Sequence, residues 1–277
     1  MMKEGLRFAA PFDFAALRTV LGSASLFALM WWRKMPMRPA GMKQLAVLGV
    51  VQTAGFLGFV NLALVTGAAG KTSVIVFIFP FWTLLMAWPL LGERVQGLQW
   101  LAVALAALGL TLVLEPWNME GSGVSKLSAL AAGICWALSS ILAKRFGAAS
   151  RMHLVSITAW QMGWGAVVLT IIAWLTPSPP IQWTGYFALI LVYNTLLGTV
   201  IGWMLWLFIL THMPAGTASL STLAVPVLGV LLARAQLGER PGAVEIAGML
   251  VIAASLALLS WITIRQQRRV EPETGQE

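Results

Sequence analysis

Long apolar stretches separated by short polar segments run along almost the whole chain. Each stretch holds about 20 residues, enough for one helix to cross a hydrocarbon core of roughly 30 Å. The pattern predicts nine membrane-spanning helices, at residues 12–32, 44–66, 72–91, 96–114, 127–146, 153–176, 185–209, 215–237 and 243–263. Because these spans leave almost no room for a soluble domain, we expect an all-α integral membrane protein.

Composition and charge agree with this class of protein. Hydrophobic residues make up 59% of the 277 positions and charged residues 10%, whereas a soluble domain carries about a quarter charged residues. The net charge of +8 comes largely from clusters at 33–43, 144–151 and 265–269. These clusters share one side of the membrane if the C-terminus is cytoplasmic. The positive-inside rule therefore explains the charge, and a nucleic-acid partner is not needed.

One motif occurs twice with the same spacing between its parts. Each copy predicts an apolar helix kinked by a proline, a polar turn and a second apolar helix. The first copy holds Ala69-Gly70, Pro80 and Gly92-Glu93-Arg94, and the second holds Ala215-Gly216, Pro226 and Gly238-Glu239-Arg240, at one offset (226 − 80 = 146). Duplicated, proline-interrupted membrane segments are typical of transporters that are built from repeats.

The repeat divides the chain into two halves. Residues 1–114 form the first and 127–264 the second, with a linker at 115–126 and a cytoplasmic tail at 265–277. The second half holds five predicted spans, and an odd number of crossings makes two copies inverted relative to each other. The first half holds four, because Pro11 aligns with Leu154 and nothing corresponds to 127–146. We expect either that the start codon has been assigned too late or that the protein is a nine-helix variant.

Several of these residues give the chain a specific resemblance to a known family. They are Pro11, Arg18, 62–64, Ala131, Trp136-Ala137 and the two Pro…Gly-Glu-Arg motifs. The chain resembles the EamA-type family of the drug/metabolite transporter superfamily over about residues 11–264. The resemblance implies an inverted repeat of five-helix units around a central cavity, with the first of ten helices absent here. It also implies a bacterial inner-membrane location and export of amino acids, related metabolites or drug-like compounds.

Few polar residues lie within the predicted spans, where each is costly unless it faces protein or a water-filled cavity. Arg18 lies about 10 Å into the membrane at 1.5 Å per residue. Its guanidinium suits a carboxylate or phosphate, and the alternative is a helix-packing arginine that snorkels or caps carbonyls. Gln161 occupies the matching position in the second half. Amide and phenol groups within the spans belong to Gln52, Asn61, Tyr193 and Asn194. These groups suit the polar end of a metabolite, and the alternative is hydrogen bonding between helices.

Deep tryptophans form a second group of candidates. Trp136, Trp160 and Trp203 predict an aromatic-walled pocket for apolar or cationic cargo, with simple space filling as the alternative. The family often has an aromatic residue at the position of Trp136. Three polar residues precede the repeated prolines: Ser73, Ser219 and Thr222. Because proline lacks an N–H, it frees a backbone carbonyl one turn earlier, which can face the cavity.

The charged residues of the motif lie at helix ends. Glu93 and Glu239, beside Arg94 and Arg240, predict boundary ion pairs or helix caps, with gating as the alternative. No acid lies near the middle of a span, so the sequence favours facilitated movement over proton coupling through a buried carboxylate. The sequence contains no metal or cofactor motif and no clustered catalytic groups, so we expect no metal, no cofactor and no enzyme activity.

The function that the sequence favours is export of small metabolites, amino acids or aromatic compounds, by alternating access. One alternative is a carrier of phosphorylated sugars or lipid-linked substrates, which would need several inward-facing basic residues. The other is a non-transporting membrane subunit, which the short first repeat favours. The expected partners are a small-molecule substrate and the lipid bilayer. The sequence does not decide whether the protein forms a homodimer.

Overall fold

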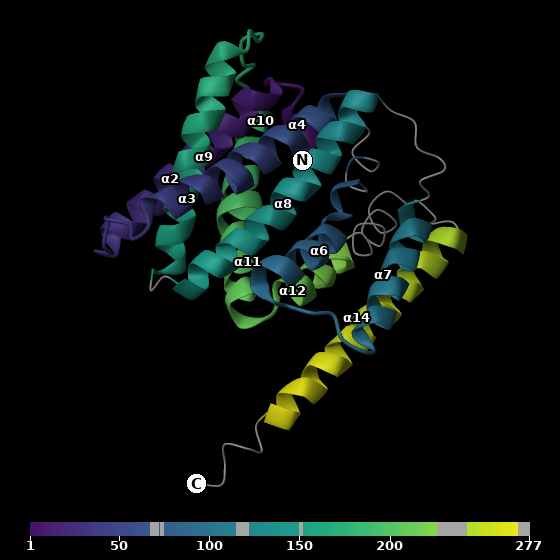
Figure 1. Ribbon diagram of the computed structural model, residues 1–277. Helices are drawn as coiled ribbons and strands as arrows, with labels where there is room; N and C mark the ends of the chain where they lie inside the picture. The colour runs from purple at the N-terminus through teal and green to yellow at the C-terminus, as the bar shows by residue number, and fades with distance from the viewer. Residues whose placement is uncertain (67–71, 73–74, 115–121, 150–151, 226–242, 271–277) are drawn as a thin grey trace. The chain divides into compact units, whose positions relative to one another are not determined.

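The computed structural model describes residues 1–270 except 67–71, 73–74, 115–121, 150–151 and 226–242. All of the regular secondary structure in this part of the chain is helical (Figure 1). The all-α prediction is therefore confirmed for the described residues. Apolar side chains dominate these helices, as the hydropathy pattern requires for helices that face lipid or one another.

Five helical stretches in the described ranges are long and apolar enough to cross a membrane. Two of them are joined from three consecutive elements. The five are α2 (Pro11–Trp32); α3 (Met42–Leu48), η1 (Gly49–Phe56) and α4 (Leu57–Thr66); α8 (Gly123–Ala149); α9 (Leu154–Leu175); and α10 (Gly185–Tyr193), η3 (Asn194–Ile201) and α11 (Gly202–His212).

The remaining helices are shorter or only partly apolar. They are α1 (Met2–Gly5), α6 (Phe79–Leu91), α7 (Gln99–Leu114), α12 (Ala215–Ser221) and α14 (Ala243–Val270). Three of them contain shorter apolar stretches, at Phe79–Leu91, Gln99–Leu112 and Ile246–Ile262. Every predicted span overlaps at least one of the helices described here. Residues 226–237 of the span at 215–237 lie outside the described residues.

The predicted span at 72–91 is not one continuous helix. A turn at residues 77–78 separates a short helical stretch from α6, and Phe81 N donates a hydrogen bond to Ile78 O at 3.0 Å. Pro80 therefore lies in the first turn of α6, where its missing N–H removes no helical hydrogen bond. Pro89 is the proline inside α6. The second predicted kink, at Pro226, lies outside the described residues.

The two halves of the sequence repeat at the level of helices. α2 and α9 each hold 22 residues. Each is followed by a long helix with an eight-residue π-helical segment at its centre, η1 in the first half and η3 in the second. A π-helix bonds residues five apart instead of four, and such segments occur frequently at functional sites. The internal repeat thus extends to an unusual backbone feature.

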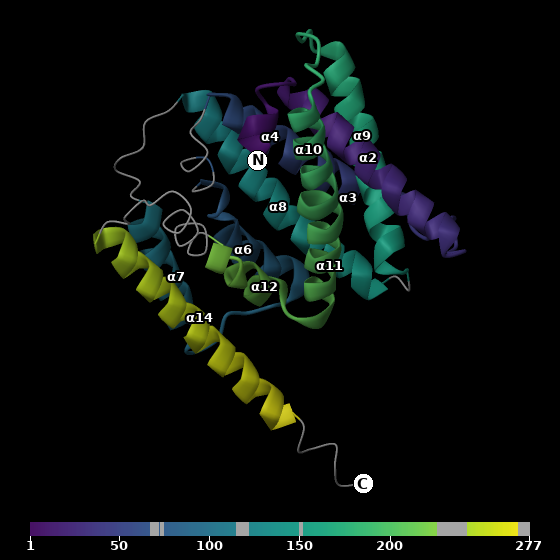
Figure 2. The ribbon, with the colours of Figure 1, turned by 180° about the vertical axis from the view of Figure 1, so that it is seen from behind.

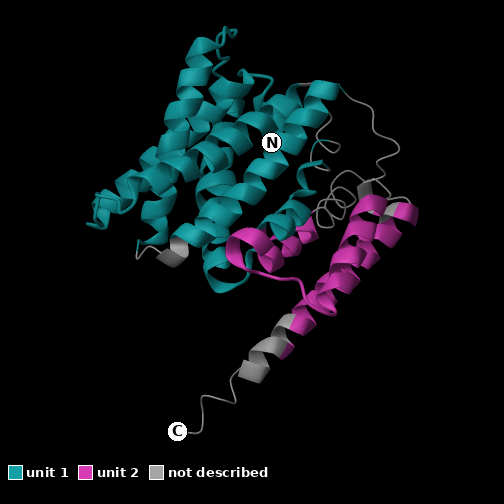
Figure 3. Ribbon diagram, in the orientation of Figure 1, with its two compact units in different colours: residues 1–86, 121–215 teal, residues 87–120, 216–277 magenta. Residues whose placement is uncertain are grey.

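The chain forms two compact units, and each unit draws on both halves of the sequence (Figure 3). Unit 1 consists of residues 1–86 and 121–215, and unit 2 of residues 87–120 and 216–277. Within unit 1, α2 packs along α9; within unit 2, α7 packs along α14 (Figures 1 and 2). Matching helices of the two copies therefore pair with each other inside each unit.

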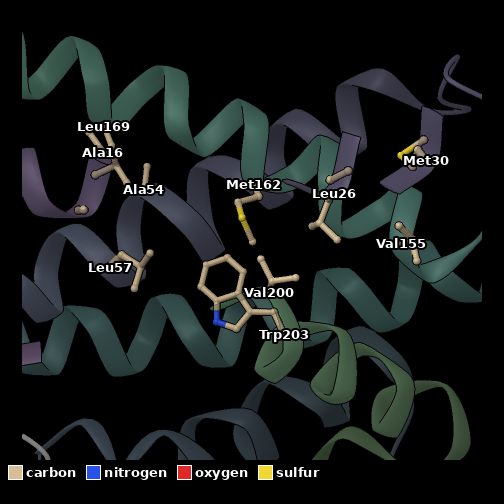
Figure 4. Close-up of a cluster of buried hydrophobic side chains, with 12 residues drawn as sticks. Ala16, Leu26, Met30, Ala54, Leu57, Val155, Met162, Leu169, Val200 and Trp203 are labelled. Atoms are coloured by element: carbon tan, nitrogen blue, oxygen red, sulfur yellow. The ribbon is translucent and has the colours of Figure 1, made fainter. Parts of the chain in front are cut away.

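Small residues allow η1 and α9 to pack backbone against backbone within unit 1. A Cβ atom on Gly165 would lie 2.1 Å from Thr53 Cβ, and a Cβ on Gly49 would lie 2.2 Å from Gln161 O. Close approach at small residues is the usual basis of helix packing in membranes. Around this contact, apolar side chains of α2, α9 and their neighbours form a buried cluster that includes Met162 and Trp203 (Figure 4).

α8 packs against η1 and α4 of the first half. The stretch from α10 to α11 is the counterpart of α3 to α4 in the second half. It carries large apolar side chains that are exposed on unit 1: Leu189, Val192, Leu197, Leu205 and Phe208. Such a surface suits lipid or another apolar helix.

Candidate functional site

Arg18 of α2 is buried inside unit 1, with 2% of its surface exposed. Its Nε donates a hydrogen bond to Thr199 Oγ1 at 3.1 Å, and its Nη2 donates to the same oxygen. Nη2 also donates to Asn194 O at 3.3 Å. Nη1 has no hydrogen-bond partner among the described residues. One edge of the guanidinium is therefore fixed against η3, and the other keeps unused donors.

The π-helical segment η3 supplies both acceptors for Arg18. Thr199 Oγ1 donates to Asn194 O at 2.8 Å, a spacing of five residues that matches the π register. The Asn194 side chain is 3% exposed, and its Nδ2 donates to Ile190 O at 2.9 Å. The Asn194 side-chain amide thus bonds its own helix, while its backbone carbonyl accepts hydrogen bonds from both Arg18 and Thr199.

Gln161 of α9 lies beside the other π segment through its backbone. Its side chain is 1% exposed, and Oε1 has no hydrogen-bond partner in the described part of the chain. Its backbone carbonyl lies against Gly49, the first residue of η1. α2 and α9 therefore each pack against the π segment of the opposite half, but only Arg18 bonds that segment through its side chain.

Asn61 and Tyr193 lie elsewhere in unit 1. Asn61 Nδ2 donates to Pro11 O at 3.0 Å, and Oδ1 has no partner among the residues described. Asn61 thereby joins α4 to the start of α2. Tyr193 is 45% exposed, unlike its neighbour Asn194. The fold does not bring the Tyr193 phenol to the buried Arg18 network.

A pocket of about 300 Å³ opens beside the start of α2 and the end of α9. Pro11 and Asp13 line it from α2, and Leu62 from α4. Asp13 Oδ2 accepts a hydrogen bond from Ser178 Oγ, which also lines the pocket, at 2.7 Å. This pocket was not predicted from the sequence, because it depends on bringing the ends of two helices together.

Trp136 of α8 lies at the centre of an aromatic cluster. Its ring centroid is 4.5 Å from that of Phe56 in η1 and 6.1 Å from that of Phe79 in α6. The centroids of Trp203 and Trp206 in α11 lie 6.3 Å and 5.7 Å away. These separations are those of favourable edge-to-face and offset ring pairs. The indole N–H groups of Trp136 and Trp206 are buried without a partner among the described residues.

Trp160 does not join this cluster. Its ring packs edge-on against Phe27 with centroids 5.0 Å apart, and its Nε1 donates to Met37 O at 3.2 Å. Of the three tryptophans that the sequence suggested for one pocket, the structure therefore brings Trp136 and Trp203 together and holds Trp160 in separate contacts. The remaining polar candidate, Gln52 of η1, is 3% exposed.

The Gly-Glu-Arg motif has a structural role in unit 2. Gly92 ends α6 with a φ of +72°, a left-handed conformation that favours glycine. Glu93 Oε2 accepts a hydrogen bond from Gly216 N in the first turn of α12 at 3.4 Å. The acid of the first motif copy therefore caps the helix that begins the second. Arg94 lies over the Trp88 ring, and Gly238, Glu239 and Arg240 lie outside the described residues.

The described residues contain no group of three or more His, Cys, Asp or Glu side chains that could hold a metal ion. His153 serves as a helix cap, since its Nδ1 accepts from Val155 N at 3.3 Å at the start of α9. Ser219 Oγ is buried, and the Thr222 hydroxyl donates to the backbone carbonyl of Ser219, three residues earlier, at 2.6 Å. Ser73 lies outside the described residues.

Sequence reasoning missed four members of this site: Thr199, Phe56, Phe79 and Trp206. A lone threonine in an apolar span is common, so nothing marked Thr199 as the partner of Arg18. Trp206 carried a usable signal, because it follows Trp203 by three residues and therefore shares its helix face.

The geometry defines a helical membrane protein with buried polar and aromatic groups inside unit 1. The model of the EamA-like transporter family matches residues 1–115 and 124–261. The chain belongs to the EamA-like transporter family, which makes it a multi-pass membrane protein of a transporter family.

Known proteins resemble the chain over nearly its whole length. The uncharacterized transporter YoaV of Bacillus subtilis is 24% identical over 96% of this chain and 92% of its own length. A probable amino-acid metabolite efflux pump of Salmonella typhimurium is 25% identical over 92% of this chain and 87% of its own length. A solved structure described as "Crystal structure of protein" has 19% identity and a TM-score of 0.78, covering 94% of this chain and 91% of that one. That likeness bears on the fold alone.

Proposed function

We propose that this protein is a carrier of the bacterial inner membrane that exports small metabolites, amino acids or related aromatic compounds, by alternating access. Membership in a transporter family supports membrane transport as the activity. Relatives in Salmonella typhimurium and Escherichia coli bear the name probable amino-acid metabolite efflux pump. Their names favour amino-acid-like cargo for this chain.

The observation that carries the proposal is the unused hydrogen-bonding capacity inside unit 1. Arg18 Nη1, Thr195 Oγ1 and Gln161 Oε1 are buried and have no partner among the described residues. Such groups cost free energy in an apolar environment unless a ligand or water uses them. Because they come from both halves of the sequence, they fit a binding site that two repeats build together.

The aromatic cluster supplies the apolar part of such a site. Trp136 lies between Phe56 of η1 and the tryptophans of α11, so helices of both halves contribute rings to it. Ligand sites in proteins combine apolar and aromatic walls with a small number of polar groups that fix orientation. An amino acid with a hydrophobic side chain has both parts.

The matched π segments support alternating access. η1 packs against α9, and η3 packs against α2, so the two halves meet through equivalent contacts. In carriers with inverted repeats, two such arrangements exchange roles and open the site to one side or the other. The basic residues after α2, among them the exposed Arg33, Lys34 and Arg38, favour a cytoplasmic location for that loop and for the C-terminus.

Metabolite loss from cells tests this function. Cells that express the chain would be compared with vector controls, and amino acids and aromatic metabolites would be quantified by mass spectrometry inside the cells and in the medium. We expect at least one of these compounds to fall inside and rise outside. Unchanged pools at a confirmed level of membrane protein would contradict the exporter proposal.

A further inference from the structure

We propose that the guanidinium of Arg18 binds the carboxylate of the exported substrate, with Nη1 as its main donor. This inference rests on the proposed export function and names the chemical group that its site selects. Substrates would share a free carboxylate, and their side chains would vary.

The first support is the charge balance around Arg18. Its acceptors among the described residues are the Thr199 hydroxyl and the Asn194 carbonyl, and both are neutral. A buried charge without a counter-charge is costly in a membrane interior, and charged groups there commonly mark substrate or ion pathways. A bound carboxylate would neutralise the guanidinium and occupy donors that have no partner among the described residues.

The second support is the geometry of the bonds that Arg18 already makes. Nε and Nη2 bond Thr199 Oγ1 and hold the planar group in one orientation. The 3.3 Å bond from Nη2 to Asn194 O is the longest of the set. A carboxylate can receive Nη1 with one oxygen and replace this long bond at Nη2 with the other. The result is the two-bond fork that guanidinium and carboxylate groups favour.

The third support is the absence of a side chain on η3 where it passes the guanidinium. Gly198 of η3 has no side chain, and a Cβ placed there would lie 3.7 Å from Arg18 Nη2 and 4.0 Å from Asn194 Oδ1. A methyl group bonded to residue 198 therefore fits next to the guanidinium at ordinary contact distance, and glycine leaves this side of Nη2 without a side chain.

The position of the site agrees with the size of an amino acid. Trp203 follows Thr199 by four residues on the same continuous helix, which is about 6 Å along its axis at 1.5 Å per residue. A carboxylate at Arg18 thus leaves an apolar side chain about one helical turn from the Trp136–Trp203 pair. The aromatic cluster then contacts the side chain while Arg18 holds the carboxylate.

The test is efflux from liposomes that contain the purified full chain. One set is loaded with the twenty protein amino acids, and another with the amines that their decarboxylation would give. We expect release of one or more amino acids and at least about tenfold slower release of the matching amine, the loss expected when a charge-assisted hydrogen bond is removed. Arg18→Met would abolish the difference, and Arg18→Lys, which keeps the charge without the fork, would restore part of it.

A second variant covers the case in which Arg18 substitutions fail to fold. Gly198→Ala would make only ordinary contacts but places a methyl group beside Nη2, where it hinders an approaching carboxylate, so it would slow amino-acid release by about tenfold. Gly58→Ala is the matched control, because its Cβ would also make only ordinary contacts, 3.5 Å from Phe12 and 3.6 Å from Leu169.

The outcomes separate the two proposals. Release of an amine as fast as its parent amino acid, or wild-type rates from folded Arg18→Met and Gly198→Ala, would overturn the carboxylate site and leave the export function standing. Release of neither set by folded wild-type protein would overturn the export function, and this site with it.

Discussion

Arg18 and Thr199 are joined by hydrogen bonds across 181 positions of the chain. The guanidinium on α2 belongs to the first half of the sequence, and the hydroxyl on η3 belongs to the second. This contact therefore ties the two copies of the repeat together inside unit 1 and fixes the orientation of a buried charge.

Replacing Thr199 by valine tests the strength of this contact. Thr199→Val keeps the shape of the side chain but removes the acceptor of Nε and the donor to Asn194 O. A buried group left without its partner costs about 1–3 kcal/mol, so we expect a lower unfolding temperature in detergent. Thr170→Val, at an exposed position of α9, is the control. Equal unfolding temperatures for the two variants would contradict the structural importance of the contact.

Replacing Gly165 by alanine tests the close packing of α9 against η1. The new Cβ would lie 2.1 Å from Thr53 Cβ, and 2.6 Å from Gly49 O, so backbone as well as side chain must move. Overpacking of this kind costs about 1–3 kcal/mol. The yield of folded protein after size-exclusion chromatography should fall. Gly185→Ala, whose Cβ meets no neighbour, should leave the yield unchanged; an equal yield from both variants would argue against this packing.

Trp136→Ala tests the aromatic cluster as part of the transport site. The substitution removes ring contacts to Phe56, Trp203 and Trp206. Each aromatic pair is worth about 0.5–1.5 kcal/mol. A substrate that packs against the Trp136 ring loses this contact in the variant, so its export should be about tenfold slower. Trp174→Ala, at an 83% exposed position, should not change export.

Membrane abundance, measured by immunoblotting, separates the two roles of Trp136. A loss of export at unchanged abundance supports contact with the substrate. A parallel fall in both quantities would show that Trp136 only fills space.

The sequence predicted features that depend on neighbouring residues better than contacts between segments that lie far apart in the chain. Helix positions follow from hydropathy, because about 20 apolar residues must pair all their backbone groups within the helix. The π segments escaped prediction, since a shift from four-residue to five-residue bonding leaves composition and hydropathy unchanged. The Gly49 and Gly165 contacts escaped it because they depend on which helices meet.

The candidate site divides in the same way. Arg18, Asn194 and Trp136 stood out in the sequence because charged, amide and indole groups are conspicuous inside apolar spans. Thr199 did not, because a hydroxyl in a helix commonly bonds its own backbone, and it does so here while also binding Arg18. The separation of Trp160 from Trp136 follows from packing between distant segments, which no local pattern records.

The orientation of the chain can be tested with single cysteines in a Cys135→Ser background. Ser178 lies in the exposed segment after α9, and Arg38 lies in the exposed segment after α2. If the C-terminus is cytoplasmic, a membrane-impermeant maleimide should label Ser178→Cys in intact cells and Arg38→Cys only after permeabilisation. The reverse pattern would contradict the proposed orientation.

The central claim is that this chain moves small carboxylated metabolites across a membrane, and release from liposomes measures it most directly. Wild-type protein would be reconstituted in liposomes loaded with the twenty protein amino acids, beside protein-free liposomes and liposomes that contain Trp136→Ala. We predict release of one or more amino acids that exceeds the protein-free leak and is slower for Trp136→Ala. Release equal to the leak from correctly folded wild-type protein would contradict the account.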